Sequence, residues 1–129
     1  MDERILVVDD SPDVANSLVR LIRALGYEAD ACYSGQEAVE HAARLLPEMV
    51  ILDLSMPGMD GHETMQLIRQ RCFGTHPIFV ALTGHSDEHR QGDAFRTGFD
   101  FYVVKPMCIE TLKELLELLD PVWAQRASA

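Results

Sequence analysis

Five side chains that can take part in chemistry each follow a short apolar run of the sequence. Asp9 and Asp10 come after the first run, Asp53 after the third, Thr83 after the fourth and Lys105 after the fifth. If these runs are parallel strands of one sheet, their carboxyl ends lie at the same edge, where ligands of such sheets bind. Three carboxylates, one hydroxyl and one ammonium group would then converge.

This set of groups predicts a particular chemistry. Three carboxylates held close together repel one another, and a divalent cation relieves that repulsion. Mg²⁺ fits best because it binds through one or two carboxylates, keeps several waters and shares a phosphoryl oxygen. Such a site can transfer a phosphoryl group to a carboxylate, with the metal and a cationic side chain stabilising the equatorial oxygens. In this scheme Asp53 is the acceptor, Asp9 and Asp10 hold the metal, and Lys105 and Thr83 contact the phosphoryl group.

The elements that must position these residues alternate between strand and helix. Apolar, β-rich runs are typical of strands, and apolar positions at helical spacing predict amphipathic helices between them. Strict alternation within one domain predicts an α/β fold, with a mostly parallel sheet and helices on both faces. The predicted strands are Arg4–Val8, Glu28–Cys32, Met49–Leu54, Ile78–Leu82 and Phe101–Val104, and the predicted helices are 12–25, 35–46, His62–Cys72, Asp87–Thr97 and Ile109–Leu119.

Length and composition limit the class of protein. A chain of 129 residues is the size of one domain, which we expect to cover residues 1–122, with 123–129 a frayed tail. The net charge of −10 argues against direct nucleic-acid binding, which requires a basic face. No apolar run is long enough to span a bilayer, and no signal region precedes the first strand, so we expect a cytoplasmic protein.

Cysteine and histidine spacing gives no metal motif. Cys32, Cys72 and Cys108 are widely separated and form no Cys-x-x-Cys pair, so reduced thiols are expected rather than a zinc site or a disulfide framework. The histidines are also scattered. His85 and His89 could share a helix face, but structural zinc usually requires four protein ligands.

Four motifs, in order along the chain, resemble those of the response-regulator receiver domains of two-component signalling. They are Val7-Val8-Asp9-Asp10, the segment Ile51 to Gly61, Ala81-Leu82-Thr83-Gly84 and Val103-Val104-Lys105-Pro106. The resemblance covers about Arg4 to Leu119, nearly the whole chain. It implies a flavodoxin-like, doubly wound, five-stranded parallel sheet of order 2-1-3-4-5 with five helices.

The resemblance also implies roles for individual residues. Asp53 matches the phosphoacceptor, and Asp9 and Asp10 match the acidic pair that binds Mg²⁺, for which Mn²⁺ can substitute. The acceptor itself and the backbone carbonyl of Ser55 match the remaining protein ligands. Lys105 matches the lysine that pairs with the phosphoryl group.

Five positions correspond to the family's switching residues, its cis-proline and its tuning residues. Thr83 matches the switch hydroxyl, and Tyr102 the aromatic that turns inward as that hydroxyl moves toward the phosphoryl group. Pro106 matches a proline whose preceding bond is usually cis. Ser55 and His85 match positions that tune the lifetime of the aspartyl phosphate.

Simpler interpretations remain open for some of these residues. Asp9 and Asp10 could cap the following helix, because carboxylates are favoured at a helix N-terminus. Thr83 could stand at a strand end for reasons of β-propensity, and Tyr102 could be an ordinary packing residue.

Three other functions compete with the receiver hypothesis. A haloacid-dehalogenase-like phosphatase would carry Asp-x-Asp after its first strand and a cap insertion, and the sequence has neither. A flavodoxin-like nucleotide or flavin binder would carry a glycine-rich or hydroxyl-rich loop where Asp9 and Asp10 stand. An unphosphorylated docking module with the same fold stays possible.

The receiver hypothesis carries expectations about partners. The phosphodonor would be a sensor histidine kinase or a histidine phosphotransfer domain, and the protein would catalyse only its own phosphorylation and dephosphorylation. The segments from Ala81 to His85 and from Gly98 to Pro106 resemble the receivers of hybrid sensor histidine kinases. In that context the parent protein would be a kinase and the phosphoryl group would pass along a relay.

Overall fold

The computed structural model describes residues 4–72, 76–84 and 98–119. A single parallel sheet of five strands forms the centre, in the order β2-β1-β3-β4-β5. The elements are β1 (Arg4–Val8), α1 (Pro12–Ala24), β2 (Glu28–Cys32), α2 (Gly35–Leu45), β3 (Met49–Asp53), α3 (Gly61–Arg71), β4 (Ile78–Thr83), β5 (Phe101–Val104) and α5 (Ile109–Glu117). The predicted fold class and strand order are confirmed. The predicted helix Asp87–Thr97 and the predicted tail lie outside the described residues.

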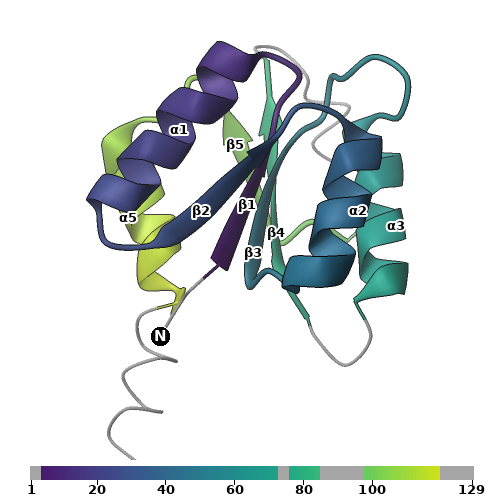
Figure 1. The fold of residues 1–129 in the computed structure, drawn as a ribbon. Helices are drawn as coiled ribbons and strands as arrows, with labels where there is room; N and C mark the ends of the chain where they lie inside the picture. Colours follow the sequence, from purple (N-terminus) through teal and green to yellow (C-terminus); the bar gives the residue numbers. More distant parts are fainter. Residues whose placement is uncertain (1–3, 73–75, 85–97, 120–129) are drawn as a thin grey trace, which may run out of the picture.

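Helices cover both faces of the sheet. In Figure 1, α1 and α5 lie together on one side of the strands, and α2 and α3 lie on the other. Because side chains alternate along a strand, each strand supplies residues to two separate hydrophobic cores. Ile5 and Val7 pack with α1 and α5, whereas Leu6 and Val8 pack with α2 and α3.

The central strand β3 is buried at every position, as its continuous apolar sequence predicts. It pairs in parallel with β1 on one side and β4 on the other, with Leu52 opposite both Val8 and Ala81. The less apolar β2 lies at an edge, as predicted. Asp53 therefore emerges at the middle of the sheet, beside the end of β1.

Local signals fix the helix ends. Ser34 caps α2 by accepting a hydrogen bond from the Glu37 amide at 3.1 Å, and Asp60 caps α3 in the same way through Glu63 at 3.0 Å. Ser11 occupies the N-cap position of α1, but its side chain makes no capping hydrogen bond. The helix α3 begins at Gly61, one residue before the predicted start.

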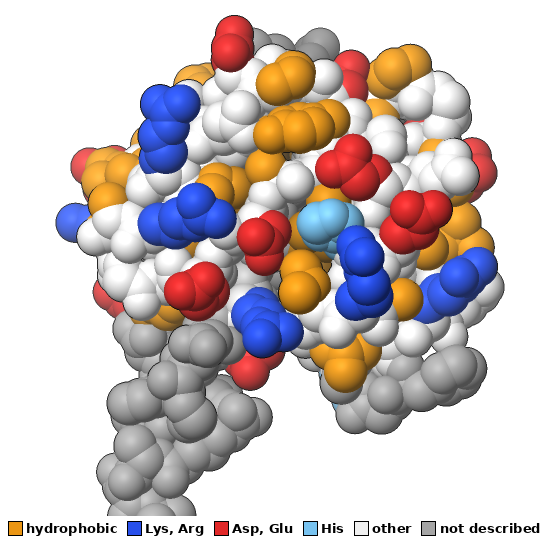
Figure 2. All heavy atoms as spheres, viewed as in Figure 1, with side chains coloured by type: hydrophobic (Ala, Val, Ile, Leu, Met, Phe, Trp, Pro, Cys, Tyr) orange, Lys and Arg blue, Asp and Glu red, His pale blue; other side chains and the backbone are white. Residues whose placement is uncertain are grey.

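Charged side chains of both signs are mixed on the surface. Figure 2 shows acidic and basic residues interspersed on the face that it presents, with apolar side chains between them. None of the described helices is both long and apolar enough to cross a lipid bilayer.

Candidate functional site

The three aspartates meet at the carboxyl ends of β1 and β3. One carboxylate oxygen each of Asp9, Asp10 and Asp53 lies within 4.8 Å of the others. Asp9 and Asp53 are buried, with 1% and 3% of their surface exposed, whereas Asp10 is exposed to solvent. Parallel pairing of the two strands brings the groups together because it aligns Val8 with Leu52, just before the acidic positions.

Lys105 joins the two buried carboxylates. Its Nζ atom lies 3.1 Å from Oδ2 of Asp9 and 3.1 Å from Oδ2 of Asp53. The backbone amide of Lys105 donates a hydrogen bond to the Thr83 carbonyl at 2.7 Å, which continues the pairing of β4 with β5. The peptide bond from Lys105 to Pro106 is cis. The ammonium group thus reaches the acidic cluster from the fifth strand.

Two backbone amides hold the other oxygens of these carboxylates. The Ser11 amide donates to Oδ1 of Asp9 at 3.0 Å, and the Ser55 amide donates to Oδ1 of Asp53 at 3.0 Å. The two arrangements are equivalent, since in each an aspartate accepts from the residue two positions later. Each buried carboxylate therefore has one oxygen on a backbone amide and the other on Lys105.

Burial sets the electrostatics of the site. It raises the pKa of the Asp53 carboxyl above its ordinary value, although the Ser55 amide and Lys105 counteract this effect; the charge of Asp9 raises the pKa further. Burial alone would lower the pKa of Lys105, but the hydrogen bonds and charges of Asp53 and Asp9 outweigh it and raise that pKa. The lysine is thus held as a cation.

The donor set suits a hard divalent cation. Carboxylate oxygens are the ligands that Mg²⁺ and Mn²⁺ prefer, and the exposed Asp10 leaves one side open to water. Three carboxylates and one ammonium group carry a net charge of −2, which a divalent cation would neutralise. The acidic cluster is therefore suited to hold Mg²⁺, the cation that the resemblance to receiver domains implies.

The structure also describes the predicted site residues Thr83, Tyr102 and Ser55. Thr83 is fully buried at the end of β4, and Tyr102 is half-buried and packs against the core under α2 and α3. Because Ala81 pairs with Tyr102, strand alternation places Thr83 and Tyr102 on the same face of the sheet. Ser55 is exposed beside Asp53. His85 lies outside the described residues.

The two amide donors were not among the predicted site residues, although the sequence carries a signal for them. Both segments read Asp-x-Ser, at Asp9 to Ser11 and at Asp53 to Ser55. An aspartate followed by a polar residue at a strand end favours a turn in which the carboxylate accepts from the second following amide.

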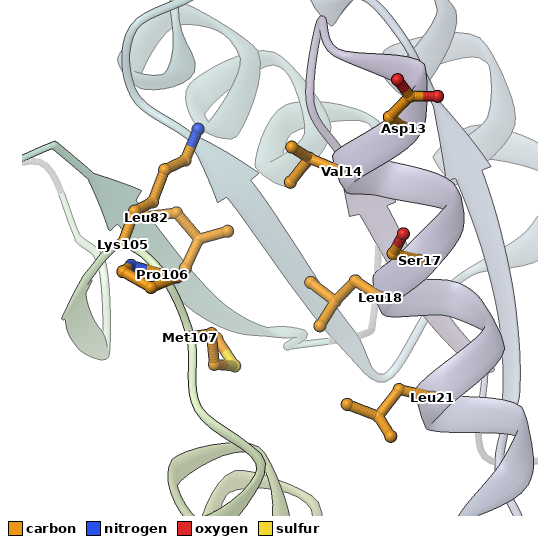
Figure 3. A pocket seen from close by; sticks show the side chains of 9 residues that line it. All are labelled: Asp13, Val14, Ser17, Leu18, Leu21, Leu82, Lys105, Pro106 and Met107. Carbon is orange, nitrogen blue, oxygen red and sulfur yellow. The ribbon is translucent and has the colours of Figure 1, made fainter.

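An apolar groove of about 420 Å³ lies beside the site. Figure 3 shows Val14, Leu18 and Leu21 of α1 facing Leu82 and Met107 across it, with the Lys105 side chain at its rim. Val14 is 44% exposed at the end nearest the acidic residues. The groove thus offers an apolar surface directly next to Lys105.

The fold and the acidic site define a class of protein, and comparison with known proteins identifies it. The family model of the response regulator receiver domain matches residues 5–117, and the chain belongs to that family. It is similar to response regulators of two-component signalling.

Two curated relatives and one solved structure illustrate this similarity. The regulatory protein VanRB of Enterococcus faecalis is 35% identical over 119 residues, which are 92% of this chain and 53% of the relative. The DNA-binding response regulator MtrA of Mycolicibacterium smegmatis is 36% identical over 106 residues, covering 82% of this chain and 45% of the relative. The chemotaxis protein CheY4 of Vibrio cholerae superimposes with a TM-score of 0.81 at 26% identity, covering 91% of this chain and 98% of that structure.

The chain spans about half the length of VanRB and MtrA. The match therefore concerns the receiver domain, and the DNA binding in the name of MtrA belongs to that protein. The hybrid-kinase context stays a prediction.

Proposed function

We propose that the protein accepts a phosphoryl group on Asp53 from a phosphohistidine of a protein donor. The observation that carries this proposal is the buried Asp53 carboxylate at the centre of the sheet, paired with Lys105 at 3.1 Å within a cluster of three aspartates. The donor is a sensor histidine kinase or a histidine phosphotransfer domain. The unphosphorylated docking module is the weaker alternative, because it has no use for this cluster.

The reaction forms a bond between a carboxylate oxygen of Asp53 and phosphorus, and breaks the phosphorus–nitrogen bond of the donor. Asp53 must be ionised to attack, and Lys105 favours that state because its positive charge lies beside the carboxylate. The same ammonium group then stabilises negative charge on the phosphoryl oxygens. Hydrolysis by water would regenerate the carboxylate and release inorganic phosphate.

Asp9, Asp10, Asp53 and the carbonyl of Ser55 would hold Mg²⁺. A metal held there would supply positive charge that offsets the carboxylates and the developing charge of the phosphoryl group. The Ser11 amide keeps Asp9 oriented by occupying its second oxygen at 3.0 Å. Ser55 and His85 are the positions proposed to tune the lifetime of the product.

The proposed switch consists of Thr83 and Tyr102. A new phosphoryl group on Asp53 would attract the Thr83 hydroxyl, and Tyr102 on the same face of the sheet would fill the space that it leaves. Phosphorylation would then stabilise a second conformation that is already present at low population. The surface around β5 and α5 would change for a partner.

The first test is phosphorylation by acetyl phosphate with Mg²⁺, followed by intact mass measurement. We expect a gain of one phosphoryl group, which is absent in Asp53→Asn and prevented by a chelator. Asp60→Asn is the matched control, since Asp60 caps α3 and its carboxylate is not one of the three that form the cluster. Phosphorylation that persists in Asp53→Asn, or no gain with either acetyl phosphate or a kinase, would overturn the proposal.

A further inference from the structure

A second group of metal-binding side chains lies where β2 meets α2. Cys32 at the end of β2 and Glu37 and His41 on α2 each place one ligand atom within 4.8 Å of the others. Cys32 is fully buried, whereas Glu37 and His41 are half-buried. None of the three belongs to the acidic cluster at Asp53.

The chain builds this group from a short connection and one helical turn. The strand β2 ends at Cys32, Ser34 caps the helix, and α2 begins at Gly35, so Glu37 and His41 lie in the first two turns after the strand end. Glu37 and His41 are four residues apart, which places them on the same face of the helix. The spacing is Cys-x4-Glu-x3-His, so the group contains no Cys-x-x-Cys pair.

The group has unused ligand capacity. The Nδ1 atom of His41 is buried and finds no hydrogen-bond partner among the described residues, a costly state for a polar nitrogen. Burial, with the neighbouring Glu37 carboxylate, raises the pKa of the Cys32 thiol to about 12. Cys32 is thus a neutral thiol at pH 7, held against a carboxylate and near an unsatisfied imidazole.

We propose that Cys32, Glu37 and His41 form a binding site for Zn²⁺. Zinc is the cation for which a sulfur, a nitrogen and a carboxylate oxygen together are suitable ligands, and sites with three protein ligands keep a fourth position open to water. Glu37 and His41 are only half-buried, so one side of the group is accessible to water. The acidic cluster at Asp53, with oxygen ligands alone, is suited instead to Mg²⁺.

The geometry and the charge of the group agree with this assignment. Zinc–ligand bonds of about 2.0 to 2.3 Å at tetrahedral angles separate ligand atoms by roughly 3.5 Å. The ligand atoms are now up to 4.8 Å apart, so side-chain rotations that bring them about an ångström closer together give this separation. Binding replaces the sulfur–hydrogen bond of Cys32 with a zinc–sulfur bond and releases the proton to solvent. One thiolate and one carboxylate then neutralise the dication in a largely buried position.

Cobalt absorbance tests the proposal directly. The full chain is titrated with Co²⁺ in excess Mg²⁺, which occupies the acidic cluster, and with a phosphine reductant that keeps the thiols reduced. We expect a thiolate-to-cobalt charge-transfer band in the near ultraviolet that saturates at one equivalent and is removed by Zn²⁺. Because the readout is absorbance, it is independent of whether Asp53 accepts a phosphoryl group.

Variants of the proposed ligands show which side chains give rise to the band. Cys32→Ser should abolish it, whereas Cys108→Ser, which alters an exposed cysteine elsewhere, should leave it unchanged. His41→Gln should weaken Co²⁺ binding by at least about tenfold. Since Cys32 is buried, the folding of its variant is checked by circular dichroism, and the half-exposed His41 decides the outcome if Cys32→Ser is unfolded. A missing band, a band that survives Cys32→Ser or one lost in Cys108→Ser would overturn the site.

Discussion

Lys105 is the residue on which the charge balance of the acidic site depends. It pairs at 3.1 Å with aspartates from two different strands, and both carboxylates are nearly fully buried. Breaking a buried ion pair from one side leaves uncompensated charge in a poorly solvated place. The lysine therefore favours the ionised state of Asp53.

We predict that Lys105→Met slows phosphorylation by acetyl phosphate roughly a hundredfold, the loss typical of removing one electrostatic contact to a transition state. The pH dependence should change as well. The pKa of Asp53 is already raised by burial, and Lys105 lowers it, so the variant raises it further. Because the attacking group is the carboxylate, the fall in rate at low pH should move to higher pH.

The measurement is the initial rate of phosphorylation as a function of pH, at saturating Mg²⁺. Lys113→Met is the control, because Lys113 is exposed on α5. An unchanged pH profile in Lys105→Met would show that the lysine does not set the ionisation of Asp53.

The roles of individual residues could be predicted from the sequence where the residues stand directly after a strand. Asp9, Asp53 and Lys105 follow apolar runs, and parallel pairing alone brings such positions to one edge. The group of Cys32, Glu37 and His41 was not predictable in this way. It depends on how a helix rests on an edge strand, and sequence spacing does not encode that contact.

At the scale of single elements, the N-terminus of α2 illustrates how one side chain stabilises a helix. Ser34 accepts the Glu37 amide hydrogen at 3.1 Å, so one of the unpaired donors of the first turn is satisfied. Ser11 occupies the same position in α1 without such a bond, and its own amide is bound to Asp9. Substitutions of these two serines therefore compare an N-cap that makes a side-chain hydrogen bond with one that does not.

We predict that Ser34→Ala lowers the free energy of unfolding by about 1 kcal/mol, the usual effect of losing an N-cap. Ser11→Ala should change it by much less, because its side chain makes no capping bond. Urea denaturation followed by circular dichroism measures both. Equal losses in the two variants would contradict the assignment of the cap.

The start of α3 shows why the exact boundaries of an element could not be predicted from the sequence. Gly61 is helical although it follows a turn-rich segment, because Asp60 caps the helix and the chain runs close to β3. A Cβ atom at Gly61 would lie 2.7 Å from the Asp53 carbonyl oxygen, so a side chain does not fit there. The glycine thus permits close packing behind Asp53, a tertiary requirement that a turn pattern does not reveal.

For the whole molecule, the acidic cluster couples metal binding to stability. The three aspartates converge only when β1 and β3 are paired, so the unfolded chain offers no comparable site. A ligand that binds only the folded state stabilises it by about 2.7 kcal/mol at a hundred times its Kd.

We therefore predict that saturating Mg²⁺ raises the Tm by several degrees and that a chelator reverses the shift. Asp10→Asn should reduce the shift, and the exposed position of Asp10 keeps the cost to folding small. Differential scanning calorimetry with and without Mg²⁺ measures this. A Tm that does not respond to Mg²⁺ would argue against a metal at the acidic cluster.

The groove beside Lys105 gives a prediction about the donor. A protein that delivers a phosphohistidine to Asp53 must approach the edge where Lys105 lies, and the apolar lining of the groove favours a packed partner there. Val14→Glu should slow transfer from a protein donor but leave phosphorylation by acetyl phosphate unchanged. Leu46→Glu is the control, since Leu46 is equally exposed at 44% but follows α2 on the other face of the sheet.

The position of β3 also determines how the protein exchanges its amide hydrogens with deuterated solvent. Every residue of this strand is buried and both its edges are paired, whereas β2 and β5 each have one free edge within the sheet. Exchange in β3 therefore requires global opening, and exchange in the edge strands requires only local opening. A ligand or modification that stabilises the whole fold would slow deuterium uptake in β3, and one that orders only an edge would leave β3 unchanged.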